Sequence, residues 1–437
     1  MSTLSERSPI ELSEVVAENE TSTETAASSR IDRRTLLRLL SAGFSFFVAG
    51  LNDGSLGVLI PWVIRDYGIN TAILSSVFLG WFTAALTNTH LSQYLDLGSI
   101  LVLGAVLQVI AQALRVWSTP FGLYVTTFWL TCLGQAYQDT HANAYVAVAA
   151  KGAHRWLGFI HAMYMAGCLI GPFAASPIAS SKGSTSSASP WYLFYTIPLG
   201  LGVVNVVLCL IAFSDTLRLT PKITEPEAQN QDTVGRQSDT NEQIPDEKAA
   251  VELIKKTLGQ KSFWNLSIFY FFYLGATITA SGWVVEYLVN VRDGDIVAMG
   301  YVPAGFSGGA LLGRLLLPEP TRRFGERLMV SIYCIICIGL QVIFWLLVGF
   351  FSGPLFATGI SVGSRLFPAD IRATALSLVF VFAQIGGSLF PVITGLVSSH
   401  KGVWVLQPML VGLISATAIS WLLVPQPKSS NLELHQE

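Results

Sequence analysis

Long apolar segments recur along almost the whole of this chain. Each is close to the length that an α-helix needs to cross the ~30 Å hydrocarbon core of a bilayer, roughly 20 residues. Twelve of them are separated by polar residues, at 36–63, 71–94, 98–117, 121–148, 157–180, 190–213, 262–289, 296–317, 328–350, 352–367, 371–397 and 403–424. Inside lipid a helix satisfies all of its own backbone groups, so the pattern predicts an all-α membrane protein of twelve transmembrane helices.

The composition agrees with a membrane-embedded chain. Of the 437 residues, 51% are hydrophobic and 12% are charged, whereas a soluble protein has about 25% charged residues. The net charge of −2 argues against nucleic-acid binding, which needs a basic face. The sequence has no metal-binding cluster, nucleophile elbow or phosphate-binding glycine loop, so we expect no metal, no cofactor and no enzymatic activity. Cys334 and Cys337 form a Cys-x-x-Cys in mid-span, which we interpret as helix packing.

A polar segment divides the apolar segments into two groups of six. Residues 214–258 are rich in acids, Gln, Asn, Thr and Pro and cannot bury a core, so we interpret them as a cytoplasmic linker. The stretch 252–264 mixes apolar residues with lysines and suits a short helix on the inner membrane surface. The other predicted parts are a disordered cytoplasmic tail at 1–35, six-helix bundles at 36–213 and 259–424, and a cytoplasmic tail at 425–437.

Basic residues lie mostly on one side of the predicted membrane. With a cytoplasmic N-terminus, the outer loops keep only Arg65, Arg115, Lys182, Arg292 and Lys401. Cytoplasmic loops are the ones enriched in Lys and Arg, so the asymmetry places both termini in the cytoplasm. We expect a monomeric, multi-pass protein of the plasma membrane, and the sequence leaves a vacuolar membrane open.

The two groups of six echo each other. Residues 78–86 of the second segment resemble 304–311 of the eighth, and 167–173 of the fifth resemble 386–391 of the eleventh. Small residues let helices approach closely, and prolines allow bends. The repetition predicts two pseudo-symmetric bundles, with a ligand bound between them near the mid-plane and reached by alternating access.

One acid lies in the middle of the first apolar segment. Asp53 would cost several kcal/mol as an isolated charge in lipid, so it must face a cavity, find a partner or take up a proton. We interpret it as a proton-binding residue. A structural hydrogen bond to a neighbouring helix is the alternative.

Polar residues also mark the fourth segment. Gln135, Asp139 and Asn143 follow at helical spacing on one stripe, flanked by Gln138. Such a stripe should face the bundle interior. A lone membrane histidine is more often a packing residue, and most aromatic residues pack or lie at the interface. With these alternatives open, the candidate substrate-binding residues are Asn52, Gln135, Gln138, Asn143, His161, Trp283 and Gln384.

These features resemble the major facilitator superfamily over about residues 36–424, and within it the fucose-permease-like sugar–proton symporters common in fungi. The resemblance is carried by Asn52-Asp53-Gly54, Leu59-Ile60-Pro61, 75–80, Gly275-Ala276, Ser281-Gly282-Trp283, 323–327, 365–368 and 384–387. It implies a secondary transporter. It also maps the acids that the branch carries in helices one and four onto Asp53 and Asp139, for proton coupling and substrate binding. For Asp139, a gating or capping role is the alternative.

The chain departs from this family in two places. The signature loop between helices two and three, normally Gly-x-x-x-Asp-Arg-x-Gly-Arg-Lys, here keeps Asp96 but no basic partner. Thr277 stands where relatives often carry an acid. The equivalent loop after helix eight keeps its basic residues, and the resemblance gives as gating residues Asp96, Arg314, Arg323 and Arg327.

The functional hypothesis is proton-coupled transport of a small organic solute, such as a sugar, by alternating access. An efflux carrier for an amphipathic secondary metabolite or toxin is the alternative, favoured by the apolar and aromatic candidates. A membrane nutrient sensor is less favoured, because the linker is short and the tails hold no signalling domain. The expected partners are a small-molecule substrate, protons and the lipid bilayer.

Overall fold

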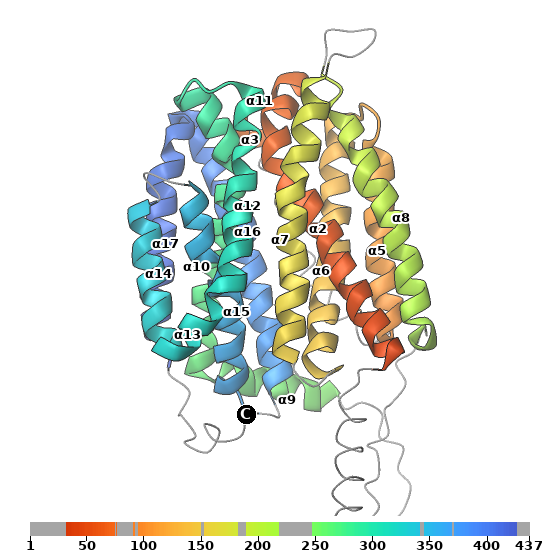
Figure 1. Cartoon of the computed structure of the whole chain (residues 1–437), viewed down its shortest axis with the longest axis vertical. Helices are drawn as coiled ribbons and strands as arrows, with labels where there is room; N and C mark the ends of the chain where they lie inside the picture. The colour runs from red at the N-terminus through yellow and green to blue at the C-terminus, as the bar shows by residue number, and fades with distance from the viewer. Residues whose placement is uncertain are drawn as a thin grey trace, which may run out of the picture.

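The structure is a computed structural model that describes residues 32–74, 76, 91, 95–149, 153–181, 189–217, 247–340, 345–368 and 371–425. Within these residues the regular structure is entirely helical, and no strand occurs. Figure 1 shows the long helices standing side by side, with short helices at both ends of the bundle. The all-α fold predicted from the apolar segments is therefore confirmed.

Five long helices of the N-terminal half are described. They are α2 (Arg33–Tyr67), α5 (Leu97–Arg115), α6 (Phe121–Ala149), α7 (Ala153–Ser180) and α8 (Thr196–Ala212), with the short η2 (Trp191–Tyr195) and η3 (Ser214–Thr216) on either side of α8. Of the predicted span 71–94, the description covers α3 (Thr71–Leu74), Ser76 and Leu91. The motifs predicted at 75–80 and 78–86 lie outside the described residues, apart from Ser76.

The C-terminal half begins with the short helix α9 (Glu247–Leu258), which runs across the lower end of the bundle in Figure 1. After it come α10 (Lys261–Val291), α11 (Ile296–Met299), α12 (Val302–Leu316), α13 (Pro318–Phe324), α14 (Glu326–Leu340), α15 (Trp345–Leu366), α16 (Arg372–Lys401), η4 (Val403–Val405) and α17 (Leu406–Leu423). On α9, Leu253 and Ile254 are half-buried, whereas Lys255 and Lys256 are exposed. This helix is amphipathic, as the mixed segment predicted.

By length and composition, eight helical segments of the described chain can cross a membrane. They are Arg33–Tyr67, Leu97–Arg115, Arg155–Ser180, Trp191–Ala212, Lys261–Val291, Ile296–Leu316, Thr374–Lys401 and Val403–Leu423. Helix α6 is long enough but more polar, because it carries the stripe from Gln135 to Asn143. The other predicted spans are not among these eight segments, so the total of twelve transmembrane helices stays a prediction.

Glycines bring α2 into backbone contact with α7, and α10 into backbone contact with α16. A Cβ added at Gly50 of α2 would lie 2.0 Å from the carbonyl oxygen of Tyr164 on α7. In the other half, a Cβ at Gly386 of α16 would lie 2.0 Å from the carbonyl oxygen of Phe271 on α10. Small residues allow such close approach of membrane helices. The matching pairs α2–α7 and α10–α16 are what two related six-helix repeats would produce.

The two halves are in contact at the end of the bundle that carries α11, the upper end in Figure 1. Thr71 Oγ1 donates a hydrogen bond to the Gly395 carbonyl at 2.9 Å, and Ser176 Oγ donates to the Val297 carbonyl at 3.0 Å. One hydrophobic cluster there includes buried residues of both halves, among them Leu59, Trp191, Trp283 and Leu406. This packing joins the two halves at the α11 end. We call the opposite end the α9 end.

Candidate functional site

Asp53 lies near the middle of α2, with hydrogen bonds to both carboxylate oxygens. Oδ1 accepts from Gln135 Nε2 on α6 at 2.9 Å and from Asn52 Nδ2 at 3.1 Å. Oδ2 accepts from the Tyr164 hydroxyl on α7 at 2.9 Å. Because the donors come from three helices, the carboxylate faces the interior of the N-terminal half rather than lipid. Asp53 is only half-buried, so it is not sealed inside that half.

The predicted polar stripe of α6 continues along the helix from Gln135. Asp139 and Asn143, on the next turns, are half-buried. Asn143 Nδ2 donates to the backbone carbonyl of Asp139 at 2.9 Å, while its Oδ1 is buried without a partner. Within the described chain, no hydrogen bond to the Asp139 carboxylate is found. The structure therefore brings Asp53 and Gln135 into direct contact, but it does not join Asp139 to Asp53.

Gln138 lies on another side of α6, where its amide forms hydrogen bonds to α5 and α8 of the N-terminal half. Its Oε1 accepts from Gln108 Nε2 on α5 at 2.8 Å and from Asn205 Nδ2 on α8 at 3.4 Å. Its Nε2 donates to the Leu101 carbonyl at 3.0 Å. In this structure the Gln138 amide links three packed helices, and substrate binding by Gln138 stays a prediction.

Trp283 also links packed helices. Its side chain is fully buried, and its Nε1 donates to the Pro391 carbonyl at 3.1 Å. The indole ties α10 to α16 and is buried in this structure, and substrate binding by Trp283 stays a prediction. Gln384, on α16, is half-buried and stays a candidate ligand.

Arg314 joins the two halves. From α12, its Nη1 donates to the backbone carbonyl of His161 on α7 at 2.7 Å, and its Nε donates to the Gly353 carbonyl on α15 at 3.2 Å. The His161 ring packs edge-on against Phe46 and Phe356, with centroids 5.4 and 4.7 Å apart. The Nε2 of His161 is buried without a partner. Arg314 is thus placed as a gating residue would be, and His161 forms part of the contact between the halves.

The other predicted gating residues do not cross between the halves in the described chain. Asp96 caps the start of α5, where its Oδ1 accepts from the Leu97 amide at 2.8 Å. Arg323 pairs with Glu319 one turn earlier at 3.0 Å, and both side chains are exposed. Arg327 Nη2 donates to the Leu422 carbonyl at 2.6 Å and so fastens α14 to α17. Among the four predicted gating residues, the structure brings only Arg314 to the other half.

Arg115 was predicted in an outer loop, and this is wrong. It forms the last turn of α5 and is 1% exposed. Its Nε donates to Thr127 Oγ1 at 2.6 Å, its Nη2 to Thr131 Oγ1 at 2.9 Å and its Nη1 to Asn52 Oδ1 at 3.3 Å. The helical spacing of Gln108, Gln112 and Arg115 marks a polar stripe on α5 that would have placed this arginine inside the bundle.

Asn52 and Tyr164 complete the surroundings of Asp53. Asn52 is buried, and its Oδ1 also accepts from Gln112 Nε2 at 2.9 Å. Both polar atoms of its amide are used inside the bundle, so Asn52 supports Asp53 rather than standing open to a solute. Tyr164 is not among the candidate residues of the sequence analysis, and its hydrogen bond to the carboxylate was missed.

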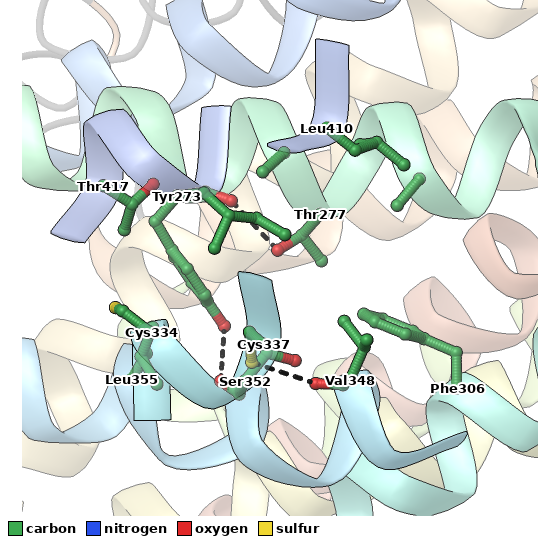
Figure 2. A pocket seen from close by; sticks show the side chains of 13 residues that line it. Tyr273, Thr277, Phe306, Cys334, Cys337, Val348, Ser352, Leu355, Leu410 and Thr417 are labelled. Carbon is green, nitrogen blue, oxygen red and sulfur yellow. Dashed lines mark hydrogen bonds between the residues drawn. The ribbon is translucent and has the colours of Figure 1, made fainter. Parts of the chain in front are cut away.

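A small cavity lies in the C-terminal half (Figure 2). Its lining comes from α10, α12, α14, α15 and α17, and includes the free thiols of Cys334 and Cys337. The Tyr273 hydroxyl donates to the Ser352 carbonyl at 3.2 Å, and Thr277 Oγ1 donates to the Tyr273 carbonyl at 2.9 Å. With these hydroxyls used locally, the wall offers a solute a largely apolar surface.

The chain matches the family model described as Major Facilitator Superfamily over residues 42–346. The chain belongs to the major facilitator superfamily. This superfamily member is 24% identical over 422 residues to Bypass of stop codon protein 6 of Saccharomyces cerevisiae, covering 89% of this chain and 82% of the yeast protein. The family resemblance inferred from the sequence is therefore confirmed.

Solved structures share the fold of this superfamily member. The E. coli fucose:proton symporter FucP is 17% identical, with a TM-score of 0.64, over 90% of this chain and 100% of FucP. A bacterial homologue of the human lysosomal transporter Spinster, in an inward-facing and unoccupied conformation, is 14% identical, with a TM-score of 0.61, over 90% of this chain and 95% of its own. The protein is an integral, multi-pass membrane protein and a secondary transporter.

Proposed function

We propose that this transporter couples the movement of a small organic solute to protons, with Asp53 as the residue that binds and releases the proton. The observation that carries the proposal is the half-buried acid in mid-helix, held by donors from α2, α6 and α7. A charge at this depth is costly unless it is partnered or neutralised. Gaining a proton removes the negative charge of Asp53, and this change of charge is what we expect to favour movement of the site between the two sides of the membrane.

The contacts of Asp53 suit both protonation states. When the carboxylate is charged, Gln135 and Tyr164 donate to it. When it is protonated, it has a hydrogen to donate, and a hydroxyl such as that of Tyr164 can turn from donor to acceptor. Gln135 Oε1 is buried and has no partner, so a second acceptor is available. A purely structural carboxylate would not need these spare acceptors.

Solute would bind between the halves, where polar groups remain available. Asp139 and Asn143 on α6 and Gln384 on α16 are half-buried side chains from opposite halves, and the buried Asn143 Oδ1 has no partner. When the two repeats rock against each other in alternating access, these side chains become exposed first to one side of the membrane and then to the other. We place the α9 end in the cytoplasm of a plasma-membrane monomer, as the distribution of basic residues predicts, and the α11 end is then on the outer side.

Export of an amphipathic metabolite is the second candidate function. It is favoured by the apolar cavity of the C-terminal half, where the hydroxyls of Tyr273 and Thr277 are already hydrogen-bonded. A solute with one polar and one apolar end would match the polar N-terminal and apolar C-terminal halves. Apolar-lined pockets with few polar groups are typical of sites for such ligands.

The test uses the purified full chain in proteoliposomes with an imposed pH gradient. A panel of radiolabelled sugars, with fucose included because FucP shares the fold, and amphipathic metabolites identifies a transported solute and its direction. Asp53→Asn should abolish gradient-driven accumulation while exchange of labelled for unlabelled solute continues. Asp295→Asn, at the exposed N-cap of α11, is the matched control and should behave as wild type. Accumulation by Asp53→Asn at the wild-type level would refute proton coupling through this residue.

A further inference from the structure

Arg115 is a buried cation without an anionic contact. Its guanidinium lies 3.8 Å from the Phe128 ring centroid and 5.1 Å from that of Tyr195. Its hydrogen bonds go to two threonine hydroxyls and one amide, all neutral groups. No ion pair links it to a carboxylate elsewhere in the described chain. Because buried charges are normally paired, this arginine requires a compensating negative charge nearby.

A single amide separates the arginine from Asp53. Asn52 Oδ1 accepts from Arg115 Nη1 at 3.3 Å, and Asn52 Nδ2 donates to Asp53 Oδ1 at 3.1 Å. Gln112 Nε2 donates to the same Asn52 oxygen at 2.9 Å and fixes which way the amide points. The Asn52 dipole therefore has its negative end toward the cation and its positive end toward the carboxylate, which is the orientation that strengthens both contacts.

We propose that Arg115 is a positioning residue for Asp53: through Asn52 it orients the donor to the carboxylate and supplies the positive charge that favours release of the proton. The proposal rests on the proposed function of Asp53 and deepens it. With Asp53 charged, this part of the N-terminal half holds one positive and one negative group. With Asp53 protonated, the buried guanidinium is left uncompensated, so the proton is held less strongly than it would be by an acid alone.

Other ionisable groups face Asp53 from the packed helices. Asp139 and Cys132 lie on α6, and Tyr164 and Cys168 lie on α7. Tyr124 and Tyr195 face Arg115. A negative charge on Asp139 would act against Arg115, because it favours the protonated form of Asp53. Arg115 is the cation that a hydrogen-bonded side chain, Asn52, connects to Asp53.

The test follows protonation directly, without a solute. The carboxylic-acid stretch of the purified full chain is titrated by infrared difference spectroscopy, and the band that disappears in Asp53→Asn is assigned to Asp53. Arg115→Gln should move the midpoint of that band upward by about one pH unit or more. Arg115→Lys keeps the charge and should stay nearer to wild type. Arg155→Gln, an exposed arginine of α7 in the same half, should leave the midpoint unchanged.

The outcomes separate the two proposals. A folded Arg115→Gln protein that titrates at the wild-type midpoint overturns the role of Arg115 and leaves proton binding by Asp53 intact. If Arg115→Gln does not fold, Asn52→Leu cuts the connection while the arginine remains, and it should shift the midpoint upward by a smaller amount; no shift overturns the proposal. If no Asp53 band titrates in the wild-type protein, both proposals fail.

Discussion

Replacing Gly50 with alanine tests whether the contact between α2 and α7 holds the Asp53 site together. The new Cβ would lie 2.0 Å from the Tyr164 carbonyl oxygen, whereas ordinary contact begins at 3.4 Å. The helices must therefore part by about 1.4 Å. The hydrogen bond from the Tyr164 hydroxyl to Asp53, now 2.9 Å, would then exceed hydrogen-bonding range. Overpacking costs about 1–3 kcal/mol, and a lost hydrogen bond to a charged group costs about 1.5–3 kcal/mol.

We therefore expect Gly50→Ala to lose about 3 kcal/mol of stability and most of its proton-driven accumulation. Thermal melting of the detergent-solubilised protein measures the first effect, and the proteoliposome assay measures the second. Gly158→Ala is the matched control. Gly158 lies on α7, the partner helix of α2, and a Cβ added there meets nothing within 4 Å. A Gly50→Ala protein that melts and transports like Gly158→Ala would show that this close approach does not support the site.

Three further changes test other parts of the structure. Trp283→Phe removes the indole hydrogen bond and should lower stability by about 1 kcal/mol without changing solute affinity; a tenfold weaker affinity at unchanged melting temperature would identify Trp283 as a ligand. Arg314→Gln removes the 2.7 Å hydrogen bond to the His161 carbonyl, so amide hydrogen exchange in that part of α7 should become faster. Unchanged exchange would show that this hydrogen bond does not stabilise the contact between the halves. The Arg38 guanidinium lowers the pKa of Asp215 at the end of α8. A carboxyl with a lowered pKa stabilises the fold above its unfolded-state pKa, and this contribution is lost as the pH falls through the lowered value. Asp215→Asn should therefore melt slightly below wild type at pH 7, by a small amount because Asp215 is exposed. The difference should vanish in acid, and a difference that grows in acid would contradict this sign.

Much of the fold could be predicted because the length and the apolar composition of a segment are enough to identify a membrane helix. The amphipathic α9 and the matched helix pairs of the two halves followed from local patterns of the same kind. The contact of Asp53 with Gln135 fitted the expectation that a mid-span acid and a polar stripe both face the bundle interior. These inferences need only the periodicity of one helix and the cost of polar groups in lipid.

The sequence was less informative where the neighbour of a helix face decides the role. Gln138 is three residues from Gln135, yet it meets α5 and α8 instead of α2. Nothing in the α6 sequence says which helix covers which side. Trp283 was an attractive ligand because aromatic residues can serve a core or a binding site equally well. Arg115 was assigned to a loop because charged residues at the ends of apolar segments usually mark the membrane boundary.

The acceptors of Arg314 are main-chain carbonyls, those of His161 and Gly353. A bond of this kind does not depend on which side chain occupies position 161. A substitution at position 161 can change the side chain there while Arg314 keeps the backbone carbonyl as its acceptor. A transporter built this way can change what it carries while this contact between its halves is kept.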